Sequence, residues 1–270
     1  MIIDAHVHIS AETDLGGFRT PPLTGDHLLK LMDGPFLVDG RPRRVDRALL
    51  QPLISVQEGA DPLAHHRYVA AEVAAHPDRF SGCFVANPLL NTDLTISCLR
   101  ELVSRSGFKA VKLHPTVHGY MPFRIRDRIE PILREATQLG VPVMFHQGDP
   151  PFGHPTQLVG MMEAHRDLTF IIAHFATQRV VMADEAIYVA RMNPNVVLES
   201  SWVDLPRVKE GVAALGTGRI VFGSDCPVQE IGSQLRTLEV LGWDPPIGIG
   251  LSAEQREMLY GDNMAKLLAS

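Results

Sequence analysis

Two histidines stand one residue apart near the start of the chain, in the apolar run "IIDAHVHIS" at residues 2–10. Side chains alternate along a strand, so His6 and His8 point to one side while Val7 points to the other. Two imidazoles side by side in an apolar interior are unfavourable unless something binds both. Imidazole nitrogens are common zinc ligands, so this spacing predicts a metal site, with a pair of hydrogen-bonded core histidines as the alternative.

Other apolar runs also end in residues that can bind metal. His146 follows "PVMF", His174 follows "IIA" and Asp225 follows "VFGS". A lone histidine at a strand end is more often structural than a ligand, but a parallel barrel brings its strand ends to one rim. Imidazoles and a carboxylate gathered there form a ligand set suited to Zn²⁺ and other first-row divalent ions.

These residues require a scaffold whose strands end together, and the sequence has the pattern of one. Short β-branched apolar runs alternate with stretches of helical periodicity. The predicted strands are residues 1–9, 46–53, 79–88, 107–115, 141–148, 168–176, 195–202 and 219–225, and predicted helices include 61–77, 92–106 and 128–140. Repeated strand–helix alternation indicates an α/β fold, a (β/α)8 TIM barrel, with an open doubly wound sheet as the alternative.

Three segments interrupt the alternation. Residues 10–45 form an insertion after the first strand, in which Thr24 is the expected cap of a short helix, and we expect this insertion to act as a lid. Residues 147–157 form a second loop. The stretch from Ser252 predicts two short C-terminal helices on the barrel exterior. No linker divides the chain, so one domain over residues 1–270 is predicted.

Composition narrows the partners. The 270 residues include 31 acidic and 25 basic side chains, for a formal net charge of −6, which indicates neither nucleic acid nor anionic lipid as a partner. The three cysteines form no Cys-x-x-Cys pair, which argues against a disulfide framework and a thiolate zinc site. Neither a secretory signal nor a long apolar span is found. We therefore expect a cytoplasmic protein with a small-molecule substrate.

In their order and spacing, seven motifs resemble those of the amidohydrolase superfamily, specifically the amidohydrolase 2 branch, which includes aminocarboxymuconate semialdehyde decarboxylase and related aromatic-acid decarboxylases. The motifs are "IDAHVH", "GFKAVKLHP", "PVMFHQG", "IIAHFA", "NVVLESS", "GSDCP" and "LYGDNMAKLL". The resemblance implies one divalent metal ion, commonly zinc, bound by residues matching His6, His8, His146 and Asp225. It also implies that His174 is the nearby catalytic histidine, and that the protein forms a homodimer as its relatives commonly do.

The fourth predicted strand carries two further candidates. Lys112 and His114 share one face and are predicted to bind substrate, Lys112 as a cation and His114 as an acid–base group. In binuclear members of the superfamily a lysine here is carboxylated and bridges two metals, whereas the resembled branch holds one. A buried Lys112 paired with Glu199 is the structural alternative. Asp4 is expected to share the face of His6 and to hydrogen-bond to a ligand.

Two reactions fit these residues. A metal ion with an open position lowers the pKa of bound water to about 7, which creates hydroxide for attack on an amide, ester or lactone, with Asp225 and His174 moving protons. The alternative is decarboxylation of an unsaturated or aromatic carboxylate. Hydrolysis is preferred because the chain is shorter than typical decarboxylases of the branch. A barrel that binds metal or ligand without turnover is a third alternative.

Overall fold

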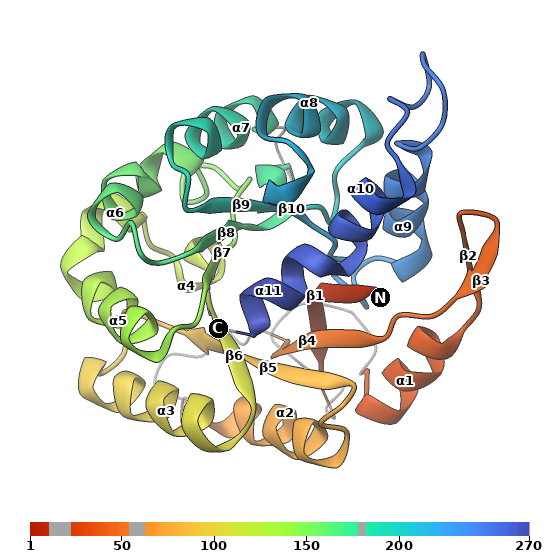
Figure 1. Ribbon diagram of the computed structural model, residues 1–270. Coiled ribbons are helices and arrows are strands. Elements are labelled where there is room, and N and C mark those ends of the chain that lie inside the picture. The colour runs from red at the N-terminus through yellow and green to blue at the C-terminus, as the bar shows by residue number, and fades with distance from the viewer. Residues whose placement is uncertain (11–22, 54–62, 178–181, 270) are drawn as a thin grey trace.

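Eight parallel strands form a closed barrel in the computed structural model, which describes residues 1–10, 23–53, 63–177 and 182–269. Backbone hydrogen bonds from Ala5 N to Phe222 O and from His8 N to Cys226 O join the first strand to the last and close the barrel (Figure 1). In sheet order the strands are β1 (Ile3–Ile9), β4 (Arg47–Pro52), β5 (Phe80–Ala86), β6 (Phe108–Leu113), β7 (Val143–Phe145), β8 (Phe170–Ile172), β9 (Val196–Glu199) and β10 (Ile220–Val221).

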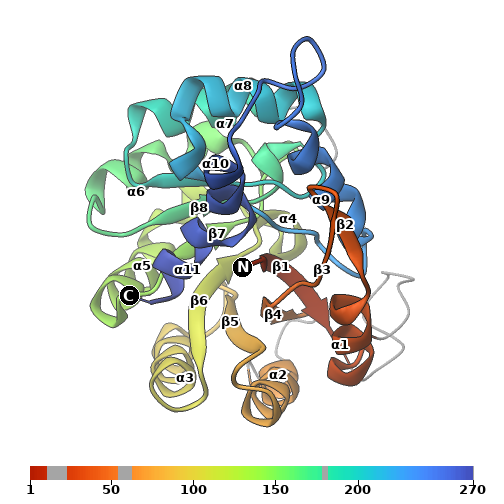
Figure 2. The same ribbon diagram turned by 45° about the vertical axis from the view of Figure 1, so that its right-hand side comes forward.

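Helices surround the strands (Figures 1 and 2). The prediction of a (β/α)8 TIM barrel is confirmed, and each predicted strand region contains one of the eight strands. No described helix is both long and apolar enough to cross a membrane. The α-helices are α1 (Gly25–Asp33), α2 (Ala64–Ala75), α3 (Thr92–Arg105), α4 (Pro115–His118), α5 (Arg126–Leu139), α6 (Val159–Ala164), α7 (Ala183–Met192), α8 (Leu205–Leu215), α9 (Ile231–Val240), α10 (Ala253–Glu257) and α11 (Asn263–Leu268).

Local sequence sets several helix starts. Thr24 accepts a hydrogen bond from His27 N at the start of α1, as predicted, and thereby satisfies a backbone donor that the helix leaves unpaired. Asn91 does the same for α3. Ser252 and Gln255 form a reciprocal capping box at the start of α10.

The insertion after β1 contains a hairpin that the sequence analysis did not identify. β2 (Phe36–Val38) pairs antiparallel with β3 (Arg41–Arg43). The turn residues Asp39 and Gly40 have φ values of 54° and 70°, and Asp-Gly is favoured in two-residue turns that need positive φ.

This hairpin contacts α9 and α10 on the outside of the barrel. Arg43 binds the carboxylate of Glu257, which also accepts a hydrogen bond of 3.0 Å from the N-terminal ammonium of Met1. The lid remains a prediction, because residues 11–22 of the same insertion lie outside the described residues.

The C-terminal helix α11 closes the amino-terminal end of the barrel. Met264 and Leu268 on this helix pack against inward-facing residues of the strands, among them Ile3 and Ala5. The expectation that both C-terminal helices pack on the barrel exterior is therefore wrong for α11. The reason is its apolar face, which fills the end of the barrel that the strands leave open.

The side chains of β1 that face the barrel interior are at odd-numbered positions at the start of the strand and at even-numbered positions at its end. Pairing with β4 aligns Asp4 with Ala48 and Val7 with Leu50, so three steps along β1 match two along β4. This irregularity has the character of a β-bulge, which shifts the alternation of side chains by one residue. Apolar side chains consequently face the interior below the bulge, and His6 and His8 contribute to the site above it.

Candidate active site

Three of the predicted metal ligands come together at the carboxyl ends of β1 and β10. His8 Nε2 lies 3.2 Å from Asp225 Oδ1, and His6 Nε2 lies 3.4 Å from the same oxygen. All three side chains are buried, and one ligand atom from each lies within 4.8 Å of the others. The structure therefore contains a group of residues that can hold a metal ion.

The Nδ1 atoms of His6 and His8 have hydrogen-bond acceptors within the protein, which leaves their Nε2 atoms, on the side of Asp225, to bind a metal ion. His8 Nδ1 donates to the carbonyl oxygen of Pro52 at 3.2 Å, and His6 Nδ1 donates to Glu199 Oε2 at 3.0 Å. Burial lowers the pKa of His6 to about 4, so this ring is neutral at pH 7. Two imidazoles held by carbonyl and carboxylate partners, together with one carboxylate, fit a divalent ion.

His146 and His174 form a second imidazole pair beside this group. His174 Nε2 lies 3.2 Å from His146 Nδ1, and the ring of His174 stacks on His6 with 4.9 Å between centroids. His146 Nε2 lies 2.7 Å from Asp149 Oδ2, so both ring nitrogens of His146 have partners within the protein. His146 is thus near the three clustered residues without being part of their group.

Glu199 connects the two imidazole pairs. Its carboxylate accepts hydrogen bonds from His6 Nδ1, the backbone N–H of His174 and the hydroxyl of Ser201. Ser201 Oγ in turn lies 2.7 Å from His174 Nδ1. Burial raises the pKa of Glu199, but the hydrogen bond from His6, the backbone N–H of Ser201 and the charge of Lys112 together lower it below its usual value. From the sequence, Glu199 is a possible partner of Lys112, whereas in the structure its hydrogen bonds come from His6, His174 and Ser201.

Lys112 is fully buried inside the barrel. Its Nζ lies 3.2 Å from His6 Nε2 and 3.3 Å from Met144 Sδ. Burial lowers the pKa of Lys112 to about 8, although the charges of Asp225 and Glu199 oppose this effect. Its ammonium therefore predominates at neutral pH, in direct contact with a predicted metal ligand.

His114 stacks on His146 with 3.7 Å between ring centroids. Its Nδ1 accepts a hydrogen bond from the backbone N–H of Val117, so its side chain also caps the short helix α4. Burial holds the pKa of His114 well below its usual value, and neighbouring His146 and Lys112 lower it further. His114 therefore enters the site as a neutral ring.

Asp4 lies outside the face that the sequence analysis assigned to it. The bulge aligns it with Ala48, which belongs to the outer core between the strands and the helices. Its carboxylate binds Ser224 and accepts a hydrogen bond from the backbone N–H of His6 rather than from the imidazole. Asp4 consequently fixes the backbone of the site.

Strained backbone is concentrated in these segments. Six non-glycine residues of the described chain have positive φ, and five of them are in the segments that carry the site: His174, Phe175, Ala176, Trp202 and Asp225. Each such residue costs roughly 1–2 kcal/mol relative to an ordinary conformation. The surrounding hydrogen bonds must hold the side chains in place against this cost.

Two contacts of the site were not identified from the sequence. The indole Nε1–H of Trp202 donates to Asp225 Oδ2 at 2.6 Å, and Gln51 Nε2 lies 3.4 Å from His8 Nε2. The position of Trp202 after an expected strand indicated that it could line the pocket. No sequence signal indicated its partner, because Trp202 and Asp225 meet through the closure of the barrel.

The family model described as Amidohydrolase matches residues 3–269, and the chain belongs to this family. A comparison with curated proteins finds no match.

Solved structures extend the likeness in fold to decarboxylases. A 2,6-dihydroxybenzoate decarboxylase from Rhizobium is 16% identical with a TM-score of 0.74, covering 99% of this chain and 98% of its own. The 5-carboxyvanillate decarboxylase from Novosphingobium aromaticivorans, solved with manganese and 4-hydroxy-3-methoxy-5-nitrobenzoic acid, is 14% identical with a TM-score of 0.76, covering 100% and 96%. A dihydroxybenzoic acid decarboxylase from Polaromonas, solved with manganese and 2-nitroresorcinol, is 16% identical with a TM-score of 0.73, covering 99% and 96%.

Proposed function

We propose that the protein is a metal-dependent decarboxylase that releases CO₂ from an aromatic or unsaturated carboxylate. The observation that carries the proposal is Lys112, the only lysine or arginine side chain that is buried within the described parts of the chain. A buried ammonium beside the predicted metal ligands compensates the charge of a substrate carboxylate that must leave water to enter the site.

The comparisons favour decarboxylation over the hydrolysis preferred from the sequence. From the sequence, hydrolysis is preferred because this chain is shorter than typical decarboxylases of the branch. The alignments do not support that reason, because they cover 96–98% of the decarboxylases' own chains. A further solved 2,6-dihydroxybenzoate decarboxylase, 16% identical with a TM-score of 0.74, contains 2,6-dihydroxybenzoate, an aromatic carboxylate. Two of the structures described above contain manganese. A planar carboxylate is accordingly the substrate class that we propose.

His6, His8 and Asp225 would hold the metal ion, and His146 is the predicted fourth ligand. We propose one divalent ion, for which zinc suits the nitrogen-rich donor set, and manganese is present in two solved structures of similar fold. When bound, the ion supplies positive charge that stabilises the anion formed as CO₂ leaves.

The remaining steps belong to the side chains. Lys112 binds and orients the substrate carboxylate. His174, the predicted catalytic histidine, and Asp225 hold and move the proton that replaces the carboxyl group on carbon. His114, stacked on the His146 ring, forms part of the wall against which a planar substrate packs.

The proposal is tested by incubating the Zn²⁺-loaded and Mn²⁺-loaded protein with hydroxybenzoates, unsaturated carboxylates, lactones and amides, while both CO₂ and acid release are followed. We expect CO₂ from at least one aromatic or unsaturated carboxylate, and loss of this activity after chelation. Acid release from a lactone or amide without CO₂ from any carboxylate would instead establish the hydrolase.

Three further properties belong to this proposal. The substrate is a small molecule, the protein is located in the cytoplasm, and two copies form a homodimer. Size-exclusion chromatography with light scattering tests the last of these, since a monomer at micromolar concentration would contradict it.

A further inference from the structure

Trp202 makes a direct contact with the carboxylate of Asp225 on the side away from the two imidazoles. Its Nε1–H donates to Asp225 Oδ2 at 2.6 Å, whereas Oδ1 faces His6 Nε2 and His8 Nε2 at 3.4 and 3.2 Å. The two oxygens of this carboxylate therefore have different partners, and only Oδ1 is directed toward the imidazole pair.

The backbone places these two side chains at a conformational cost. Trp202 has a φ of 66° and Asp225 a φ of 62°, both in the left-handed region that disfavours non-glycine residues. Thr177 Oγ1 lies 3.2 Å from Trp202 O and 2.8 Å from His174 O, which links the strained segment after β9 to that after β8. Backbone strain of this kind is concentrated at functional sites, where the surrounding structure holds it in place.

We propose that Trp202 is a positioning residue for the metal site, because its N–H holds Asp225 so that Oδ1 alone is offered to the ion. This inference rests on the metal site proposed above and is independent of the reaction.

The chemistry of the indole suits this role. An indole N–H is a donor only and carries no charge, so it orients a carboxylate without repelling a nearby cation. A lysine or arginine in its place would also bind Oδ2, but it would weaken the attraction between Asp225 and a divalent ion. Partners of this kind typically contribute 10–100-fold to metal affinity.

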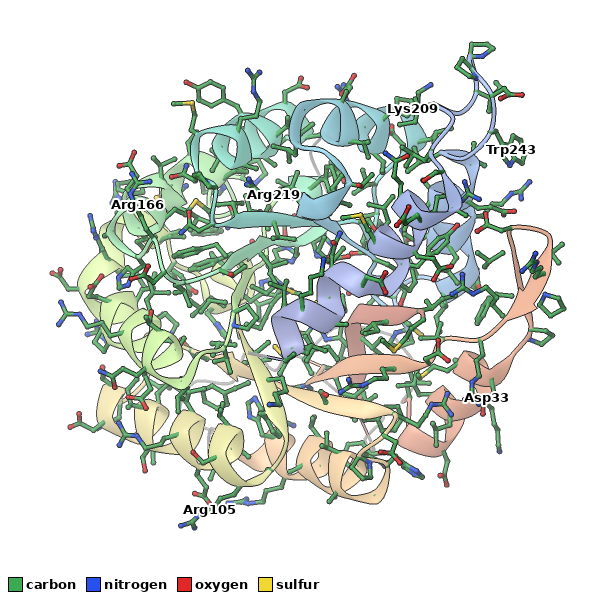
Figure 3. All side chains as sticks on the ribbon, viewed as in Figure 1. Asp33, Arg105, Arg166, Lys209, Arg219 and Trp243 are labelled. Atoms are coloured by element: carbon green, nitrogen blue, oxygen red, sulfur yellow. The ribbon has the colours of Figure 1, made fainter. Side chains whose placement is uncertain are left out.

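The first test compares Trp202→Phe, which removes the N–H but keeps a flat ring, with the matched control Trp243→Phe. Trp243 lies at the outer edge of the molecule and is 44% exposed (Figure 3). Metal affinity is measured by competition with a chelating dye for Mn²⁺ and Zn²⁺. We expect a loss of 10–100-fold for Trp202→Phe and no change for Trp243→Phe. A folded Trp202→Phe protein with an affinity within twofold of the unmodified protein would overturn the inference.

A double-mutant cycle tests whether Trp202 acts through Asp225. In the Asp225→Asn background, Trp202→Phe should change metal affinity by less than twofold, because its partner carboxylate is already gone. An equal loss in both backgrounds would mean that Trp202 acts otherwise and would also reject the inference.

A spectroscopic measurement covers the case in which Trp202→Phe does not fold. In Trp243→Phe, Trp202 is the only tryptophan, and paramagnetic Mn²⁺ bound by Asp225 should quench its fluorescence in proportion to occupancy measured by electron paramagnetic resonance. Unquenched fluorescence at full occupancy would overturn the inference. If the unmodified protein binds neither ion, both the proposed metal site and the role of Trp202 are rejected. Unchanged affinity in Trp202→Phe rejects the role of Trp202 alone.

Discussion

The two ends of the barrel interior differ sharply in chemistry. At the amino-terminal end, Ile3, Ala5, Met144 and Ile171 belong to one apolar cluster with Met264 and Leu268 of α11. At the carboxyl-terminal end the same strands carry imidazoles, an ammonium and carboxylates, nearly all of them buried. The amino-terminal end thus holds the strands together by apolar burial, while the carboxyl-terminal end contains buried polar groups that require specific partners.

The transition between these ends occurs within single strands. In β1 it falls at the bulge, after which His6 and His8 occupy the positions above Ile3 and Ala5. In β6 and β7, Lys112 Nζ contacts Met144 Sδ at the boundary. In the same set of strands, the amino-terminal parts stabilise the fold and the carboxyl-terminal parts carry the residues of the site. Substitutions at the two ends should therefore have different effects.

The largest effect is expected for Asp225→Asn at the carboxyl-terminal end. Asparagine keeps the shape and tolerates the left-handed backbone, but it removes the charge offered to the metal ion. Turnover should fall roughly 10³-fold or more, while the melting temperature changes little. Steady-state kinetics of the metal-loaded proteins measure this, and full activity in the variant would reject the role of Asp225.

A smaller effect is expected for Lys112→Met. Methionine fills the site of the buried cation but cannot bind a carboxylate, so kcat/KM for a carboxylate substrate should fall roughly 10²-fold. Thermal stability should stay the same or rise, because replacing a buried charge by an apolar residue is often neutral or stabilising. Unchanged kcat/KM would show that the substrate carboxylate binds elsewhere.

At the amino-terminal end, Met264→Ala should reverse this pattern. Met264 is 1% exposed within the apolar cluster, so its truncation should lower the free energy of unfolding by about 3 kcal/mol. Metal affinity and kcat of the folded protein should be unchanged. Urea unfolding and metal titration of the same preparation measure both, and a matching loss of metal affinity would show that the two ends are not independent.

The smallest effect concerns His118, which borders the carboxyl-terminal end. Burial lowers its pKa from 6.5 to about 4, so the unfolded chain binds more protons between these values and stability falls as pH falls through this window. His118→Phe should remove this dependence. Between pH 7.5 and pH 5, the free energy of unfolding of the unmodified protein should therefore fall by about 2 kcal/mol relative to that of the variant. Urea unfolding at the two pH values measures the difference, and parallel stability changes in both proteins would contradict it.

Much of the fold could be predicted because its signals are local. Apolar runs followed by helical periodicity located all eight strands, and Thr24 and Ser252 marked helix starts by their side-chain chemistry. The grouping of His6 and His8 with Asp225 followed from strand alternation and the common rim of a parallel barrel.

The rest depended on contacts between distant segments. The bulge in β1 arises from pairing with β4, and nothing in "IIDAHVHIS" distinguishes it from regular alternation. Trp202 binds Asp225 across 23 residues of sequence, and it does so at a positive φ that tryptophan rarely adopts. The location of α11 was also beyond prediction, because an amphipathic helix does not specify which apolar surface it covers.

The left-handed backbone at His174, Trp202 and Asp225 also bears on how the protein can be altered. Glycine would adopt these conformations without strain, yet it would remove every side chain that the strain places. Selection for thermostability alone would therefore work against the active site, and screens for stabilised variants should exclude these three positions.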